Sequence, residues 1–162
     1  MSSFADWKRV FEVNMHKIIK DIAEKSEVKQ AIIDYNQEQL SQGIDSLGQR
    51  IETIASQEQN SGYPYSKYTV KIRGSEGLQV NNVDLNYTGQ LWNSMEVEVS
   101  EKGMKVMADT KKSGGDVKDN FESRFDFFGL TEKNKKGFAI WVLSDYLKPA
   151  LLQLFTSAKT SL

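Results

Sequence analysis

The stretch between residues 83 and 108 most constrains the fold, because its hydrophobic pattern changes from a helical to a strand period within a few residues. Thr88 and Gly89 make a break, with Thr88 as an expected helix cap, and Leu91 and Met95 then lie four apart, as on one helix face. Beyond Met95, apolar and charged residues alternate in two runs, which predicts a β-hairpin with one apolar face and Glu opposite Lys on the other. The apolar positions of the hairpin are Val97, Val99, Met104, Val106 and Ala108. This turn, helix and hairpin unit carries no arrangement typical of a reaction centre.

The N-terminal part, residues 1–42, has the strongest helical period of the chain. Apolar residues three or four apart predict a helix over residues 4–24, with a stripe formed by Phe4, Trp7, Phe11, Met15, Ile18 and Ile22. An aromatic stripe at this spacing is usually core, although two large rings near the N-terminus could instead dock on a partner. A second helix is predicted from a cap at Ser26 to the region of Gln42 and Gly43.

The C-terminal part, residues 131–162, predicts one long helix. Thr131 is the expected cap, and apolar residues at helical spacing extend to Ala158. Pro149 lacks a backbone donor, so we expect a kink or break between Asp145 and Lys148. Because Trp141, Phe155 and further apolar residues give this helix more than one apolar face, it is either central to the fold or shared with a neighbour.

The segment before that helix is expected to be irregular. Residues 109–120 form a polar stretch with two adjacent glycines, which predicts a long loop, and in an assembly protein such a loop would contact a neighbouring subunit. Four phenylalanines between positions 121 and 128 indicate a strand or an irregular edge packed on the sheet. With residues 43–130 as sheet and loops between the helical parts, we predict a single α+β domain over residues 1–162: N-terminal helices, a small antiparallel sheet with the central hairpin, and the long C-terminal helix packed on it.

Composition excludes several kinds of site. The absence of cysteine rules out disulfides, thiol catalysis and cysteine-ligated zinc. A net charge of −1 gives no long-range field, which disfavours non-specific binding to nucleic acid. Residues 1–4 lead directly into a charged amphipathic helix, and no apolar run approaches about 18 residues, so we expect a soluble protein without a secretory signal or a membrane span.

The sequence contains no pattern typical of a catalytic or metal-binding site. His16 is the single histidine, so it has no second histidine for a metal pair, and a solvated helical side chain is the better interpretation. Glu96 and Glu98 share a strand face but lie opposite Lys102 and Lys105, which favours a solvent face over acid–base chemistry. We therefore expect no enzyme, no cofactor and no metal.

The order of these signals resembles the small neck and tail-completion proteins of tailed bacteriophages. Three groups of residues carry the likeness, which spans residues 36–155: Tyr65, Ser66, Tyr68 and Lys71; then Val83, Asp84, Leu85, Thr88, Gly89, Leu91 and Ser94; then the step Phe127-Phe128-Gly129-Leu130-Thr131 before the last helix. The likeness favours short strands at Ile44 and from Arg50 to Ile54. The polar, turn-rich residues from Gln57 to Pro64 predict a loop. For residues 66–73, alternation alone predicts a strand, whereas the likeness, a cap at Ser66 and a stop at Gly74 favour a helix.

The resemblance implies a structural role in a ring at the capsid vertex or tail end, as a head-to-tail connector, tail-completion or tail-terminator protein. Its partners would be copies of itself, portal or adaptor proteins and tail proteins, in the virion and, during assembly, in the host cytoplasm. Lysines at 111, 112, 118, 133, 135 and 136 would at most make passive contact with DNA in the lumen. The expected inter-subunit residues are Phe4, Trp7, Phe11, Lys111, Lys112, Gly114, Gly115, Trp141 and Phe155.

Two other functions stay open. A monomeric binding or regulatory module of a phage would have the same composition, and light scattering separates it from a ring by mass. A small metal-dependent hydrolase would need dispersed carboxylates to converge in space, and a divalent-metal-dependent activity would reveal it.

Overall fold

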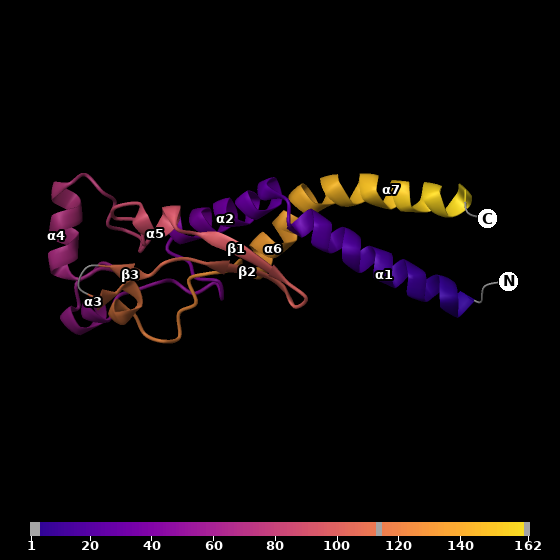
Figure 1. Cartoon of the computed structure of the whole chain (residues 1–162). Coiled ribbons are helices and arrows are strands. Elements are labelled where there is room, and N and C mark those ends of the chain that lie inside the picture. Colours follow the sequence, from indigo (N-terminus) through magenta and orange to yellow (C-terminus); the bar gives the residue numbers. More distant parts are fainter. Residues whose placement is uncertain (1–3, 113–114, 161–162) are drawn as a thin grey trace.

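The computed structural model describes residues 4–112 and 115–160. The molecule is elongated, and two long helices project from it at one end (Figure 1). These are α1 (Phe4–Ala23) and α7 (Ser144–Thr160), which run in opposite directions and contact each other; we call this pair the arm. The short helices α3 (Ile54–Gln59) and α4 (Lys67–Ser75) lie at the opposite end.

The centre of the molecule holds α2 (Ser26–Ser41) and an antiparallel hairpin of β1 (Glu96–Ser100) and β2 (Gly103–Met107). The remaining elements are short: α5 (Gln90–Asn93), β3 (Lys111–Lys112), β4 (Gly115–Asp116), the 3-10 helix η1 (Val117–Asn120), α6 (Glu132–Phe138) and the π-helix η2 (Ala139–Leu143). The predicted α+β class is confirmed.

The hairpin alternates as predicted, with two exceptions: Met104 of the expected apolar face is exposed, and Glu96 pairs with Met107 because Lys102 lies in the turn. Val97 pairs with Val106 and both are buried, whereas Glu98 pairs with Lys105 on the exposed face. Helix α2 packs against β1 and also contacts α6, and Phe138 of α6 joins the same core. The hairpin and both helices therefore share one apolar centre.

Two buried polar side chains of α2 hold the start of the C-terminal helical segment. The Asn36 amide donates to the carbonyl oxygens of Phe127 (3.1 Å) and Gly129 (3.0 Å). The Gln39 side-chain oxygen accepts from the Thr131 backbone N–H at 2.8 Å. Gly129 has a φ of +147°, and a Cβ there would lie 3.3 Å from the Ser46 Cβ, so glycine suits this close crossing.

The N-terminal half agrees with the prediction in its long helices and differs in its caps and loops. The bounds of α1 and α2 are confirmed, but the N-cap of α2 is Lys25 and Ser26 lies inside the helix. Ile44 and Arg50 form only an isolated bridge, and Ile54 begins α3, so the strand predicted up to residue 54 is wrong. The physical reason is Thr53, whose hydroxyl accepts from the Ser56 backbone N–H at 3.1 Å and starts a helix inside the expected loop.

Residues 67–75 form a helix, which confirms that alternative. The Ser66 hydroxyl accepts from the Thr69 backbone N–H at 3.1 Å, as expected of its cap. The stop is not Gly74, which lies inside α4, but Glu76 and Gly77, whose φ is +71°. At α5 the N-cap is Gly89 and not Thr88, which accepts only a long bond from Gln90 at 3.4 Å.

The segment expected as one long loop has its own structure. Within residues 109–120, β3 pairs with β4, and η1 begins at a capping box between Asp116 and Asp119. The short polar side chains that predicted a loop instead bond to the backbone and cap a short helix. The phenylalanine-rich segment that follows has no strand, and Phe121, Phe125 and Phe127 are buried in the core.

The C-terminal segment begins as predicted and breaks earlier than predicted. The Thr131 hydroxyl caps α6 by accepting from the Asn134 backbone N–H at 3.3 Å. The irregularity is the π turn at 139–143, not the region between Asp145 and Lys148, and α7 continues through Pro149. An extra residue in one turn changes the helix phase before the proline is reached.

Candidate functional site

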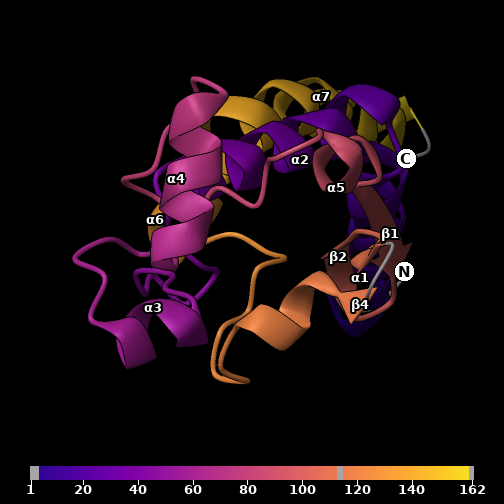
Figure 2. The same ribbon diagram turned by 90° about the vertical axis from the view of Figure 1, so that its left-hand side faces the viewer.

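A concave surface lies at the end of the molecule opposite the arm. It is a cleft of about 730 Å³ with walls from α3, α4, residues 83–91 and residues 109–121. Figure 2 looks onto this end and shows the backbone of α3, α4 and η1 there. This volume lies within the range of binding sites for small molecules or for single side chains of a partner.

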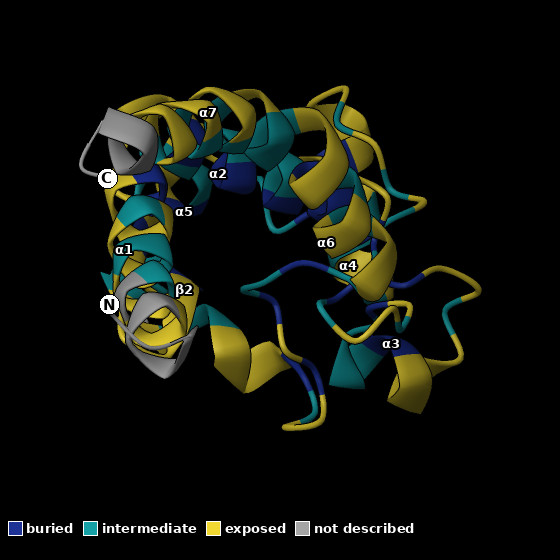
Figure 3. Cartoon of the chain, turned by 90° about the vertical axis from the view of Figure 1, so that its right-hand side faces the viewer, coloured by how far each residue is buried: buried dark blue, intermediate teal, exposed yellow. Residues whose placement is uncertain are grey.

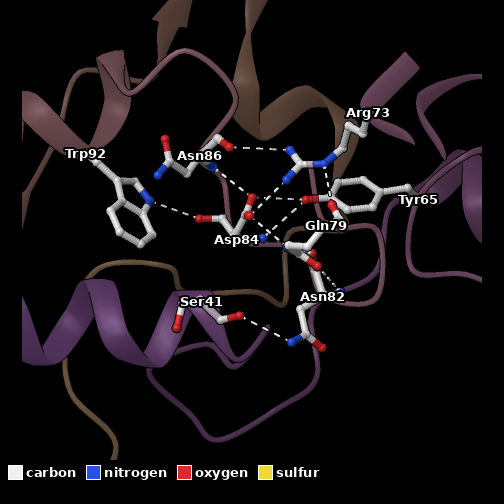
Figure 4. Close-up of polar contacts among 8 residues, drawn as sticks. All are labelled: Ser41, Tyr65, Arg73, Gln79, Asn82, Asp84, Asn86 and Trp92. Atoms are coloured by element: carbon white, nitrogen blue, oxygen red, sulfur yellow. Dashed lines mark hydrogen bonds and ion pairs between the residues drawn. The ribbon is translucent and has the colours of Figure 1, made fainter. Parts of the chain in front are cut away.

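Tyr65, Arg73 and Asn86, which we call the floor of the cleft, belong to a buried polar network. Asp84 is the centre of this network and lies behind the cleft lining (Figure 4). One carboxylate oxygen of Asp84 accepts from Arg73 at 2.8 Å and from the Gln79 amide at 2.7 Å. The other accepts from the Tyr65 hydroxyl at 3.2 Å and from the Asn86 backbone N–H at 2.9 Å. Every hydrogen-bonding site of this carboxylate is thereby used, so the network positions the cleft walls rather than offering a free acid.

The network also fixes an unusual backbone conformation. Leu85 has a φ of +54°, which is uncommon for a residue with a branched side chain. The bond from the Asn86 N–H to the Asp84 carboxylate closes a turn over Leu85, and Trp92 donates its indole N–H to the Asp84 carbonyl at 2.9 Å. Leu85 lines the cleft, so this turn presents an apolar side chain to it.

Burial dominates the electrostatics of the floor. Burial, with the Asp84 charge in second place, raises the pKa of the Tyr65 phenol well above its usual range. The Arg73 guanidinium lies over the Tyr65 ring at 4.8 Å and is neutralised by Asp84. Tyr65 therefore stays a neutral donor, and the floor carries no net charge.

The rim of the cleft is aromatic and acidic. Tyr68 is 73% exposed, and Tyr87, also exposed, donates its hydroxyl to Glu76 at 2.8 Å, which raises the pKa of that phenol. Three carboxylates line the rim without a cationic partner among residues 4–112 and 115–160: Glu58, Asp109 and Asp119. Lys111 is the opposing charge on the rim.

The arm is the second unusual surface. None of residues 144–156 of α7 is buried, although α7 lies beside α1 and contacts it (Figure 3). The centroids of the Phe11 and Phe155 rings lie 6.1 Å apart, yet the Phe155 side chain remains half exposed. Two packed helices cannot enclose an apolar seam from all sides, so the arm leaves it partly open to solvent.

A third surface lies where α6 meets α7, at the root of the arm. Ile140 is 59% exposed and Trp141 is 74% exposed. Lys133 and Lys136 precede them at helical spacing and form no ion pair within the described chain, whereas Lys135 bonds to Glu132. We call these four residues, Lys133, Lys136, Ile140 and Trp141, the root patch.

The predicted inter-subunit residues fall on all three surfaces. Phe11 and Phe155 meet in the arm, Trp141 lies in the root patch, Lys111 lines the cleft, and Gly115 is exposed in β4. Phe4 and Trp7 lie in the first turns of α1 and Lys112 in β3, but their side chains are outside the described set, as is Gly114 altogether. Their role in contacts between subunits stays a prediction.

The sequence interpretation missed the cleft. Tyr68 entered the sequence analysis only through the family likeness, and Tyr87 and Glu58 were not predicted to have a role. The concentration of tyrosines at positions 63, 65 and 68 in a polar stretch was the available signal, since Tyr supplies an apolar ring with a polar tip.

No group suited to metal chemistry is present among the described residues: no three His, Asp or Glu side chains converge on a common point. His16 contacts the carbonyl of Glu12, one turn earlier in α1. No helix in the described part of the chain has the length and apolar character to cross a bilayer. No family model, curated protein or solved structure matches the chain.

Proposed function

We propose that the protein is a structural subunit of a tailed-bacteriophage particle, acting in the neck as a head-to-tail connector, tail-completion or tail-terminator protein. It works by association alone and assembles as a ring of identical copies. The half-open seam of the arm is the observation that supports this most, because apolar residues at that spacing are normally covered.

The distribution of the surfaces favours a ring over a symmetric dimer. A closed ring uses heterologous interfaces, in which two different surfaces of each copy meet. The chain carries its arm at one end and its cleft at the other, so a subunit can contact one neighbour at each end (Figure 1). Surfaces not used between copies are then available to the portal or adaptor on one side and to tail proteins on the other.

DNA plays a passive part in this proposal. The lysines of α6 and of the 111–118 segment are interspersed with acidic residues such as Asp116, Asp119 and Glu132. Such mixed charge suits a wall that DNA passes and not a surface that grips it, since gripping requires several clustered cations.

The mass of the purified protein tests the proposal. Size-exclusion chromatography with light scattering should give a large integer multiple of 18.4 kDa, either for the chain alone or after co-expression with portal and tail proteins encoded beside it. A single subunit mass in both experiments, or adjacent genes unrelated to phage particles, contradicts it.

A further inference from the structure

The cleft and the root patch have complementary chemistry. The cleft combines apolar walls with three carboxylates on its rim that form no ion pair within the described chain, namely Glu58, Asp109 and Asp119. The root patch combines two exposed apolar side chains with two lysines that have no carboxylate partner in the described chain.

We propose that the cleft of one copy receives the root patch of the next copy, with Trp141 as the anchor in the cleft. This inference rests on the proposed ring and identifies the two surfaces that would form it. The partner copy thus supplies the side chain that fills the cleft.

Trp141 has the properties of an anchor. Its side chain is 74% exposed on a helix whose neighbouring turns, α6 and α7, hold it in place. Tryptophan is the residue type most enriched among those that dominate binding energy, and such residues sit in desolvated pockets. The cleft offers Leu85, Ile72 and the Tyr68 ring as apolar walls for an indole.

Charge sets the orientation of the contact. Arg73 is neutralised by Asp84, so Lys111 is the cation that offsets the three carboxylates of the rim. Lys133 lies about two turns and Lys136 about one turn before Trp141. Both would meet this acidic rim when the indole enters the cleft. A root patch meeting another root patch would instead bring lysines together, which disfavours a symmetric contact.

Cross-linking tests the geometry, and the chain has no natural cysteine to interfere. Ile140→Cys and Tyr68→Cys each place a thiol at an exposed position, one in the root patch and one on the cleft rim. When the two variants are mixed with a flexible bismaleimide, we expect a cross-linked pair, and neither variant alone should give one. No product in the mixture, or an equally abundant product from Ile140→Cys alone, overturns the inference.

Substitution tests the energetics. Trp141→Ser should weaken self-association at least about thirtyfold in light scattering across a concentration series. Leu47→Ser is the matched control, because Leu47 is also an exposed apolar side chain, lies on another surface, and should leave the association unchanged. Glu58→Lys and Lys136→Glu should each weaken association, and the two changes combined in one chain should recover part of it.

The outcomes separate this inference from the proposed function. Rings whose mass and stability survive Trp141→Ser and Glu58→Lys overturn the pairing of cleft and root patch and leave the ring proposal standing. A subunit that stays monomeric, alone and with portal and tail proteins, overturns both.

Discussion

The charges of Arg73 and Asp84 compensate each other in a region nearly inaccessible to solvent. A guanidinium nitrogen of Arg73 lies 2.8 Å from a carboxylate oxygen of Asp84. Removing one member of a buried pair leaves the other charge without compensation. The carboxylate of Asp84 would keep only neutral donors from Tyr65, Gln79 and Asn86.

Arg73→Met should therefore destabilise the protein by about 3 kcal/mol, measured by urea unfolding. Lys29→Met is the control, since it breaks the partly exposed pair with Glu24 and should cost less than about 1 kcal/mol. Equal effects of the two substitutions would show that the network at Asp84 contributes no more than a surface ion pair.

The Tyr65 phenol should ionise only at a higher pH than free tyrosine does. Its raised pKa means that the folded state holds the phenolic proton more tightly than the unfolded state, in which the pKa is about 10. The resulting stability is complete below that pH and is lost as the pH rises toward the folded-state pKa. In NMR spectra of ring-labelled protein, Tyr65 should remain neutral at about pH 10.5, where free tyrosine is mostly ionised. Tyr65→Phe assigns the signal, and titration of Tyr65 together with free tyrosine would contradict the prediction.

Among the elements, α7 lacks one backbone hydrogen bond that a substitution could restore. Pro149 lies inside the helix, is exposed, and has no N–H to donate to the carbonyl of Asp145. Pro149→Ala should restore that bond without removing packing and should stabilise the arm by about 1–3 kcal/mol. Thermal unfolding followed by circular dichroism checks this, with Pro64→Ala, which changes the other proline of the chain outside any helix, as the comparison. A lower midpoint for Pro149→Ala would mean that the proline shapes the arm.

Elements defined by a long repeated pattern were predictable from the sequence. The stripe through Phe11, Met15 and Ile18 and the alternation of the hairpin each involve many residues, so tertiary packing reinforces the local signal. Two local signals conflict at α4. Its β-branched residues favour a strand, whereas the cap at Ser66 favours a helix, and the structure has the helix.

Elements defined by one or two hydrogen bonds were not predictable. Helix α3 depends on the cap at Thr53, and η1 depends on the reciprocal bonds of Asp116 and Asp119, both inside stretches whose composition indicates loops. The cleft was hidden for a related reason. Its walls come from four separate segments, and side-chain bonds between residues distant in sequence, such as those from Asp84 to Tyr65 and Arg73, bring them together.

At the scale of the whole molecule, stability should be uneven. Helix α2 contains the fully buried Val28 and Leu40, whereas no described side chain of α7 between residues 144 and 156 is buried. Regions with few buried apolar contacts open locally at lower free energy than the core does.

Hydrogen exchange should show this gradient. In the dissociated subunit, amides at 150–156 should exchange at least about tenfold faster than those at 32–40, because local opening suffices for the first group. If the arm is covered in the ring, the difference should shrink on assembly, as measured by mass spectrometry at low and high protein concentration. Equal protection of both segments in the dissociated subunit would contradict the prediction.

The π turn at 139–143 has a consequence for how the two halves of the C-terminal segment are aligned. Each residue of an α-helix turns the chain by about 100°, so removing one residue from this turn would rotate everything beyond it by roughly that angle. Phe155, whose ring now contacts Phe11 of α1, would then point away from that ring, while Phe138 stayed in the core. The wide turn thus acts as a one-residue spacer that keeps the two ends of the segment in phase with different neighbours.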